Sequence, residues 1–142
     1  MARQISIFLE NKAGRLLHVT RTLGEAGINI RALSIADTSD FGILRIIVND
    51  PEKAHTILKE AGFTVSETEV VAVQVPDTPG SLAGILEQMN EENLNIEYLY
   101  AFIGTNADNA LVVFKVEDIA RALEAFRKKG IKYMEESELY KL

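Results

Sequence analysis

The chain contains no cysteine, which excludes disulfides, thiolate nucleophiles and cysteine metal ligands together. It has only two histidines, His18 and His55, each on an expected helix and without clustered carboxylates. A surface or core histidine is therefore the favoured interpretation of both. Paired carboxylates or a nucleophile beside a base do not stand out either. We therefore expect no catalytic site, no metal and no cofactor.

An excess of basic charge is also missing. Lys and Arg number 15 against 21 Asp and Glu, which gives a net charge of −6 and a pI of about 5.0. Such a balance argues against a protein that binds nucleic acid through its phosphates. The first 15 residues turn polar too early for a signal peptide, and no apolar run approaches the ~18 residues of a membrane span. We predict a cytoplasmic protein without a nucleic-acid or membrane partner.

An internal repeat relates the two halves of the chain. A shift of 66 residues aligns residues 9–35 with residues 75–101, with six identities in 27 positions. The first members of these pairs are Gly14, Leu16, Glu25, Asn29, Ile30 and Leu33. A shift of 68 then pairs Val48, Asp50, Ala54 and Gly62 with Val116, Asp118, Ala122 and Gly130. Because the matches fall at expected turns, caps and core positions, we infer that both halves build one backbone.

Each copy reads as strand, helix, strand, strand, helix, strand. In the first copy, residues 4–9 alternate in polarity, residues 16–26 follow helical spacing up to Gly27, and residues 28–36 and 42–48 favour strands. Asp50 and Pro51 begin a second helix that Gly62 ends, and residues 63–67 return to the sheet. In the second copy, strands are expected at 71–75, 95–103 and 110–116, with helices at 82–89 and 119–126.

This order predicts an α+β fold of two tandem ferredoxin-like βαββαβ units, with antiparallel sheets and helices on one face. We place the first domain at residues 1–68 and the second at 69–142. Units of this size bury little core, so we expect them to pack together and to form a homodimer or higher homo-oligomer. Tyr98, Tyr100 and Phe102 alternate along one strand and would mark that interface if exposed. Packing within the chain is the alternative.

The C-terminal tail resembles the start of a further strand. Residues 136–142 match residues 67–73 at a shift of 69. We therefore expect the tail to add to a sheet edge.

Two places in each copy carry polar groups suited to a small ligand. One is the loop after the first strand, Asn11 to Gly14 and Asp77 to Gly80; the other is the asparagine that opens the second strand, Asn29 or Asn95. A helix N-terminus attracts a carboxylate, and asparagine offers both a donor and an acceptor. Simpler roles stay open: Asn11 and Asp77 as helix caps, the glycines as turn residues, and Asn29 and Asn95 as ties between strand ends.

The pattern Asn/Asp-x-x-Gly, followed fifteen residues later by Asn-Ile within βαββαβ, resembles the ACT domain, and both copies show it. The resemblance covers essentially the whole chain and implies an amino-acid-binding regulatory module whose effector sits where two domains meet. It implies ligand-binding roles for Asn11 and Asn29 in the first copy and for Asp77 and Asn95 in the second. The candidate sites also include the neighbouring motif residues Lys12, Ala13, Gly14, Arg15, Leu16 and Ile30, and Thr78, Pro79, Gly80, Ser81 and Ile96.

The two copies depart from this pattern differently. A ligand-binding histidine of the serine-regulated members, two residues before the loop asparagine, is replaced by Leu9 and Val75, so serine specificity does not carry over. Asp77 adds negative charge to the second loop, whereas Lys12 and Arg15 flank the first. We therefore expect the first copy to be better suited to a carboxylate.

The sequence favours a regulatory, allosteric protein that binds a free amino acid and acts in trans on an enzyme of amino-acid metabolism. The main alternative is a protein-interaction module with vestigial ligand sites. An acylphosphatase-like hydrolase is disfavoured, because the second loop carries Thr78 and Ser81 where a phosphate loop needs a cation.

Overall fold

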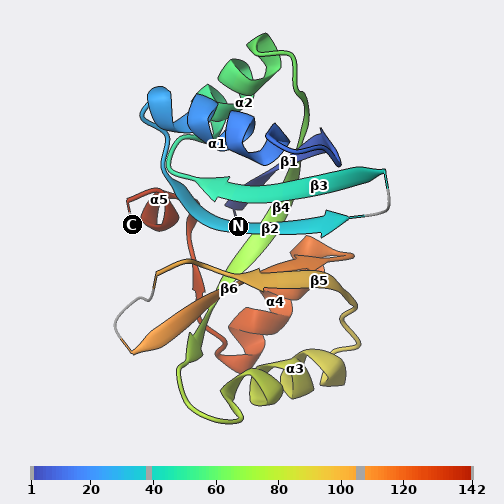
Figure 1. The fold of residues 1–142 in the computed structure, drawn as a ribbon. Coiled ribbons are helices and arrows are strands. Elements are labelled where there is room, and N and C mark those ends of the chain that lie inside the picture. The colour runs from blue at the N-terminus through green and yellow to red at the C-terminus, as the bar shows by residue number, and fades with distance from the viewer. Residues whose placement is uncertain (1, 38–39, 105–107, 142) are drawn as a thin grey trace. The chain divides into compact units, whose positions relative to one another are not determined.

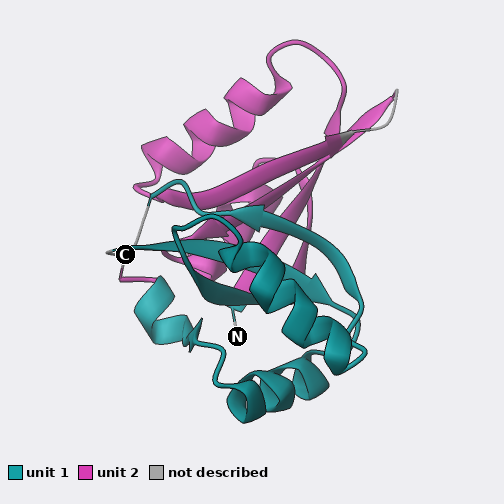
Figure 2. Cartoon of the chain, turned by 90° about the horizontal axis from the view of Figure 1, so that it is seen from below, with its two compact units in different colours: residues 1–2, 69–139 teal, residues 3–68, 140–142 magenta. Residues whose placement is uncertain are grey.

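The computed structural model describes residues 2–37, 40–104 and 108–141, shown as a ribbon in Figure 1. The chain forms two compact units, coloured separately in Figure 2. The N-terminal unit, magenta in that view, holds residues 3–68 together with Tyr140 and Lys141. The C-terminal unit, in teal, holds residues 69–139 together with Ala2. That residues 1–68 and 69–142 are separate domains, each able to fold independently, stays a prediction.

The N-terminal unit follows the order β1 (Ala2–Glu10), α1 (Arg15–Glu25), β2 (Ile30–Asp37), β3 (Phe41–Val48), α2 (Pro51–Glu60) and the first part of β4 (Thr64–Pro76). Its strands lie side by side as β2-β3-β1-β4, and β3 pairs antiparallel with both β1 and β2. Alternate strand residues pack against one side of each helix, and this core includes Ile5, Ile7, Leu44, Ile46, Val19, Leu23 and Leu58.

The C-terminal unit repeats the plan with the last part of β4, then α3 (Ser81–Glu91), β5 (Ile96–Ala101), β6 (Asn109–Val116), α4 (Ile119–Lys129) and β7 (Tyr133–Met134). Its strand order is β7-β4-β6-β5, with antiparallel pairs throughout. The core includes Val71, Val73, Ile85, Met89, Phe114, Ala122 and Phe126. The predicted fold of tandem ferredoxin-like units is therefore confirmed.

The second helix of each unit begins as the sequence predicts. Asp50 accepts a hydrogen bond from the backbone N–H of Lys53 at 3.2 Å, and Asp118 accepts the equivalent bond from Arg121 at 3.2 Å. The side chains of Lys53 and Arg121 then reach the end of the first helix, where they donate to the carbonyls of Ala26 at 2.8 Å and Glu92 at 2.6 Å. The repeat therefore extends to individual hydrogen bonds.

The C-terminal tail differs from its prediction as a strand. Residues Glu136–Leu139 form the short helix α5, in which the carbonyl of Glu135 accepts bonds from the N–H groups of Glu138 and Leu139 at 3.0 and 3.1 Å. This turn places Leu139 in a fully buried position. The expected strand is wrong because a short alternation of polar and apolar residues also suits one helical turn that buries a single leucine.

The aromatic side chains of the predicted stripe, on β5 and at Phe102 just after it, differ in burial. Tyr100 is buried within the chain, and its ring stacks on that of Tyr98 with centroids 6.5 Å apart. Phe102 is half-buried. An oligomer interface at this stripe stays a prediction. Across the described residues, the helices are too short and too polar to cross a membrane.

Candidate functional site

The turn between β1 and α1 has a fixed backbone path. The N–H of Lys12 donates to the carbonyl of Glu10 at 2.8 Å, and the N–H of Arg15 donates to the carbonyl of Lys12 at 3.3 Å. The N–H of Asn11 donates to the carbonyl of Asp40 at 3.0 Å, which ties the turn to the strand opposite. The turn thereby gathers six of the predicted site residues at one end of the sheet: Asn11, Lys12, Ala13, Gly14, Arg15 and Leu16.

The turn between β4 and α3 repeats this path bond for bond. Thr78 donates to Pro76 at 2.9 Å, Ser81 donates to Thr78 at 3.2 Å, and Asp77 donates to Asp108 at 3.0 Å, all through the backbone. The hydroxyls of Thr78 and Ser81 are also hydrogen-bonded to each other at 2.5 Å. Asp77, Thr78, Pro79, Gly80 and Ser81 therefore form the equivalent candidate site.

Glycine, rather than asparagine or aspartate, occupies the N-cap position of the first helix in each unit. Gly14 and Gly80 precede α1 and α3 with φ values of 87° and 84°, and neither helix has a side-chain cap. The capping interpretation of Asn11 and Asp77 is therefore wrong. Only glycine adopts this left-handed conformation without strain, so the turn needs Gly14 and Gly80 at these points.

Asn29 and Asn95 do tie strand ends together, but through their backbones. The carbonyl of Asn29 accepts from the N–H of Asn49 at 3.2 Å, and the carbonyl of Asn95 accepts from Glu117 at 3.3 Å. Neither bond uses the asparagine side chain. Asn95 also lines a hollow of about 620 Å³ together with Asp118 and Arg121.

Within each unit, the two groups of candidate residues lie at opposite ends of the sheet. On β3, Phe41 stands opposite Glu10 and Val48 stands opposite Ile30, so the strand separates the turn from Asn29 by about 24 Å. In the C-terminal unit, Asn109 stands opposite Pro76 and Val116 opposite Ile96 in the same way. One unit therefore cannot bring its turn and its strand-opening asparagine to the same small ligand.

Charged groups of both signs lie close together at the first turn. The carboxylate of Glu10 lies 2.9 Å from the ammonium of Lys12 and 3.7 Å from the guanidinium of Arg15. The hydrogen bond from Lys12, followed by the positive charges of Lys12 and Arg15, lowers the pKa of Glu10. The carboxylate is thus ionised at neutral pH and stands beside two cations.

A cleft beside this turn is the feature that the sequence analysis missed. It encloses about 290 Å³, and its lining includes Glu10, Arg15 and His18 with the aromatic rings of Phe8, Phe41 and Phe63. The imidazole of His18 lies against Phe63, with ring centroids 5.0 Å apart. These residues come from four separate segments, and only the alternation of Phe8 and Glu10 along one strand hinted at a shared face.

The described ranges, with their gaps at 38–39 and 105–107, contain no grouping of three His, Asp or Glu side chains suited to a metal ion. The cations of the first turn stand next to the negative charge of Glu10, which opposes the binding of a phosphate group there. The arrangement suits a ligand that carries both charges better than an anion.

The architecture is similar to that of solved proteins. Protein BT0572 from Bacteroides thetaiotaomicron is similar at a TM-score of 0.93 and 44% sequence identity, over 99% of this chain and 96% of that one. The regulatory subunit of aspartate kinase from Thermus thermophilus, in its ligand-free form, is similar at a TM-score of 0.63 and 18% identity, over 89% of this chain and 90% of that one. The corresponding subunit from Thermus flavus gives a TM-score of 0.59 and 19% identity, with the same coverage.

At these identities the two aspartate kinase subunits share the fold alone. No match was found among curated proteins. Residues 1–142 match the family described as an ACT domain pair, and the chain forms two βαββαβ units. The chain therefore belongs to the ACT domain family.

Proposed function

We propose that the protein is a regulatory module that binds a free amino acid at the turn between the first strand and first helix of an ACT unit. The repeated turn carries this proposal, because two distant segments of the chain form the same hydrogen bonds around a left-handed glycine. The fold of each unit accounts for the turn itself. It does not account for the exposed polar residues in that turn. The binding roles of Asn11, Asn29, Asp77 and Asn95 stay predictions.

The separation of the candidate residues within a unit supports binding at a junction. Since Asn11 and Asn29 of one unit are about 24 Å apart, a ligand that contacts both kinds of group must take them from two different units. Those units belong either to one chain or to two copies in a homodimer. Ligand binding would then shift assembly through its different affinity for the associated and separate states.

We also propose that the protein regulates a partner enzyme. We propose that it acts in trans, in the cytoplasm, on an enzyme of amino-acid metabolism. The fold shared with a regulatory subunit of aspartate kinase supports a role of this kind.

Thermal unfolding of the full chain with each common amino acid tests the proposal. A ligand at 100 times its dissociation constant stabilises by about 2.7 kcal/mol, which a melting curve resolves easily. Asn29→Ala and Asn95→Ala should each be compared with wild type, and sedimentation should record the assembly state with and without the ligand. If no amino acid changes the melting temperature or the assembly, the alternative of a protein-interaction module with vestigial sites is correct.

A further inference from the structure

The cleft beside the first turn has a counterpart in the second copy. The N-terminal cleft is lined by Phe8, Glu10, Phe41 and Phe63, and the C-terminal one, of about 270 Å³, is lined at the equivalent positions by Gln74, Pro76, Asn109 and Ile131. Both clefts lie between the end of the first strand and the start of the last strand of their unit. The two units thus share a cleft at the same place in the backbone but line it with different side chains. A difference in chemistry between the two clefts therefore comes from the side chains and not from the fold.

The N-terminal cleft offers the two charges that a zwitterion needs. The carboxylate of Glu10 is a partner for an α-ammonium group, and the guanidinium of Arg15 can hold an α-carboxylate through two N–H donors. Their closest atoms are 3.7 Å apart, beyond hydrogen-bond distance, so the guanidinium keeps donors for a ligand. Lys12 also contacts Glu10, but its side chain is 66% exposed, and an exposed ion pair of this kind yields readily to a competitor.

Aromatic side chains form the apolar wall of the same cleft. Phe8 is 49% exposed and Phe41 is 56% exposed, although large apolar side chains of a small domain are usually buried. Both lie on the sheet face that carries Glu10, because Phe41 stands opposite Glu10 and Phe8 is two residues before it. Phe63 also lines the cleft, and the imidazole of His18 lies against its ring. Rings placed in this way favour an aromatic or large apolar group of a ligand.

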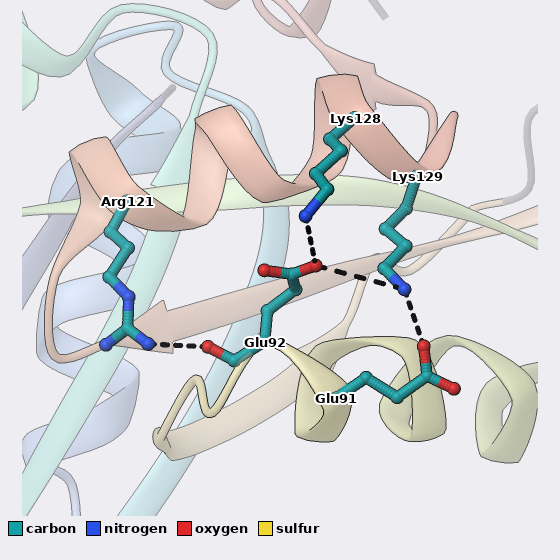
Figure 3. A network of polar contacts seen from close by, with 5 residues as sticks. All are labelled: Glu91, Glu92, Arg121, Lys128 and Lys129. Atoms are coloured by element: carbon teal, nitrogen blue, oxygen red, sulfur yellow. Dashed lines mark hydrogen bonds and ion pairs between the residues drawn. The ribbon is translucent and has the colours of Figure 1, made fainter.

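The C-terminal cleft lacks both features among the described residues that line it, which include no aromatic ring and no carboxylate. It presents the amides of Gln74, Gln88 and Asn109 and the amines of Lys129 and Lys132. Figure 3 shows that Lys129 reaches Glu91, at 2.5 Å, and Glu92, at 3.8 Å, which link α4 to α3. This cleft therefore suits neither an ammonium group nor a ring.

We propose that the N-terminal cleft binds an amino acid with an aromatic or large apolar side chain, and that the C-terminal cleft does not. Glu10 holds the ammonium group, Arg15 holds the carboxylate, and Phe8, Phe41 and Phe63 surround the side chain. The volume of about 290 Å³ is at the small end of ligand pockets, which suits a single amino acid rather than a nucleotide. This inference rests on the proposed function and names the class of its effector.

Calorimetric titration of the full chain tests each charge separately. The probes are L-phenylalanine, 3-phenylpropionate, which lacks the ammonium group, 2-phenylethylamine, which lacks the carboxylate, and L-aspartate. L-Phenylalanine should bind about tenfold more tightly than any of the others. Arg15→Gln should weaken L-phenylalanine and 3-phenylpropionate by about tenfold without affecting 2-phenylethylamine, and Glu10→Gln should show the reverse selectivity.

Matched controls come from the second cleft. Asn109→Ala occupies the position equivalent to Phe41→Ala, and only the change at Phe41 should weaken L-phenylalanine. Amide NMR signals locate the ligand on the wild-type protein without any substitution: the signal of Gly62, which lines the N-terminal cleft, should shift on addition of L-phenylalanine. The signal of Gly130, at the same position in the C-terminal cleft, should not.

The outcomes separate this inference from the proposed function. If L-aspartate or another small polar amino acid binds and L-phenylalanine does not, the regulatory role stands and the assigned class is wrong. The inference is also wrong if L-phenylalanine shifts Gly130 instead of Gly62, or if Arg15→Gln leaves its affinity unchanged. If no amino acid binds at all, both fail together.

Discussion

The side-chain oxygen of Asn49 accepts a hydrogen bond from the backbone N–H of Asn29 at 3.0 Å, while the N–H of Asn49 donates to the carbonyl of Asn29 at 3.2 Å. This reciprocal pair joins the start of β2 to the end of β3 and uses the side chain of Asn49 but only the backbone of Asn29. We predict that Asn49→Ala lowers the free energy of unfolding by about 1 kcal/mol. Asn29→Ala should change it by less than about 0.5 kcal/mol.

Urea unfolding of both variants measures the two values. The contrast matters for function, because a binding defect in a stable Asn29→Ala protein reports on the ligand rather than on folding. A large loss of stability in Asn29→Ala would contradict the assignment of the bonds to its backbone.

Two glycines at α3 should respond to alanine with opposite signs. Gly80 precedes this helix with a φ of 84°, whereas Gly84 lies inside it, where an added methyl group would meet open space. Gly80→Ala should destabilise the protein by about 1 kcal/mol because the new side chain is strained in the left-handed region. Gly84→Ala should stabilise it by about 1 kcal/mol because alanine is the better helix former. Melting curves of the two variants decide the signs.

The pKa of Glu10 should depend on Lys12. The hydrogen bond and charge of Lys12, with a further contribution from the charge of Arg15, lower this pKa below its ordinary value. Because the pKa of this carboxyl group is lowered, its interaction with the two cations stabilises the folded protein above the ordinary carboxyl pKa. This stabilisation is lost as the pH falls through the lowered pKa of the folded protein. Lys12→Gln should raise the pKa in an NMR titration, whereas Lys53→Gln, on α2, should leave it unchanged.

The charge network between α3 and α4 should be sensitive to salt. The hydrogen bond between Lys129 and Glu91 raises the pKa of Lys129. The stabilisation from this bond is therefore present below the ordinary lysine pKa and is lost as the pH rises through the raised pKa of the folded protein. Glu91→Gln should lower the melting temperature at low ionic strength, and the difference should shrink at about 1 M salt. Glu87→Gln on the same helix is the control. An equal effect of both variants would contradict the role of the network.

The burial of Leu139 on the tail helix α5 predicts that this side chain stabilises the core. Leu139 is fully buried on α5, whereas Glu138 is exposed. Leu139→Ala should lower the free energy of unfolding by about 2–5 kcal/mol, as truncation of a buried leucine does. Glu138→Ala should have little effect. A melting temperature of Leu139→Ala close to that of wild type would show that the tail is dispensable.

The sequence predicted those parts of the fold that depend on local signals. Asp50 with Pro51 begins α2, and Gly27, Gly62 and Gly130 follow helices with positive φ, as expected from their residue types. The antiparallel sheets with helices on one face were predictable because a repeated βαββαβ pattern permits few arrangements.

Predictions failed where local patterns were ambiguous. Asn11 and Asp77 are good capping residues, but the left-handed glycines Gly14 and Gly80 take the cap position instead. The tail matched a strand only over a few residues, too few to distinguish it from a turn of helix that buries Leu139.

The candidate site was predictable only in part. The loop residues Asn11 to Gly14 were identified from their place after the first expected strand, but the separation of Asn29 from them depends on the register of β3. The cleft required the positions of Phe8, Phe41 and Phe63, which are far apart in sequence. Hydrophobic residues at such positions look like ordinary core until the structure shows that two of them are exposed.

Residues near position 140 belong to the unit that is synthesised first. The hydroxyl of Tyr140 accepts a hydrogen bond from the N–H of Arg3 at 3.4 Å, and both residues are part of the N-terminal unit. A ribosome that releases domains in order normally lets the first one fold while the next is made. The hydrogen bond between Arg3 and Tyr140, which are 137 residues apart in the sequence, therefore forms only after nearly the whole chain has been made.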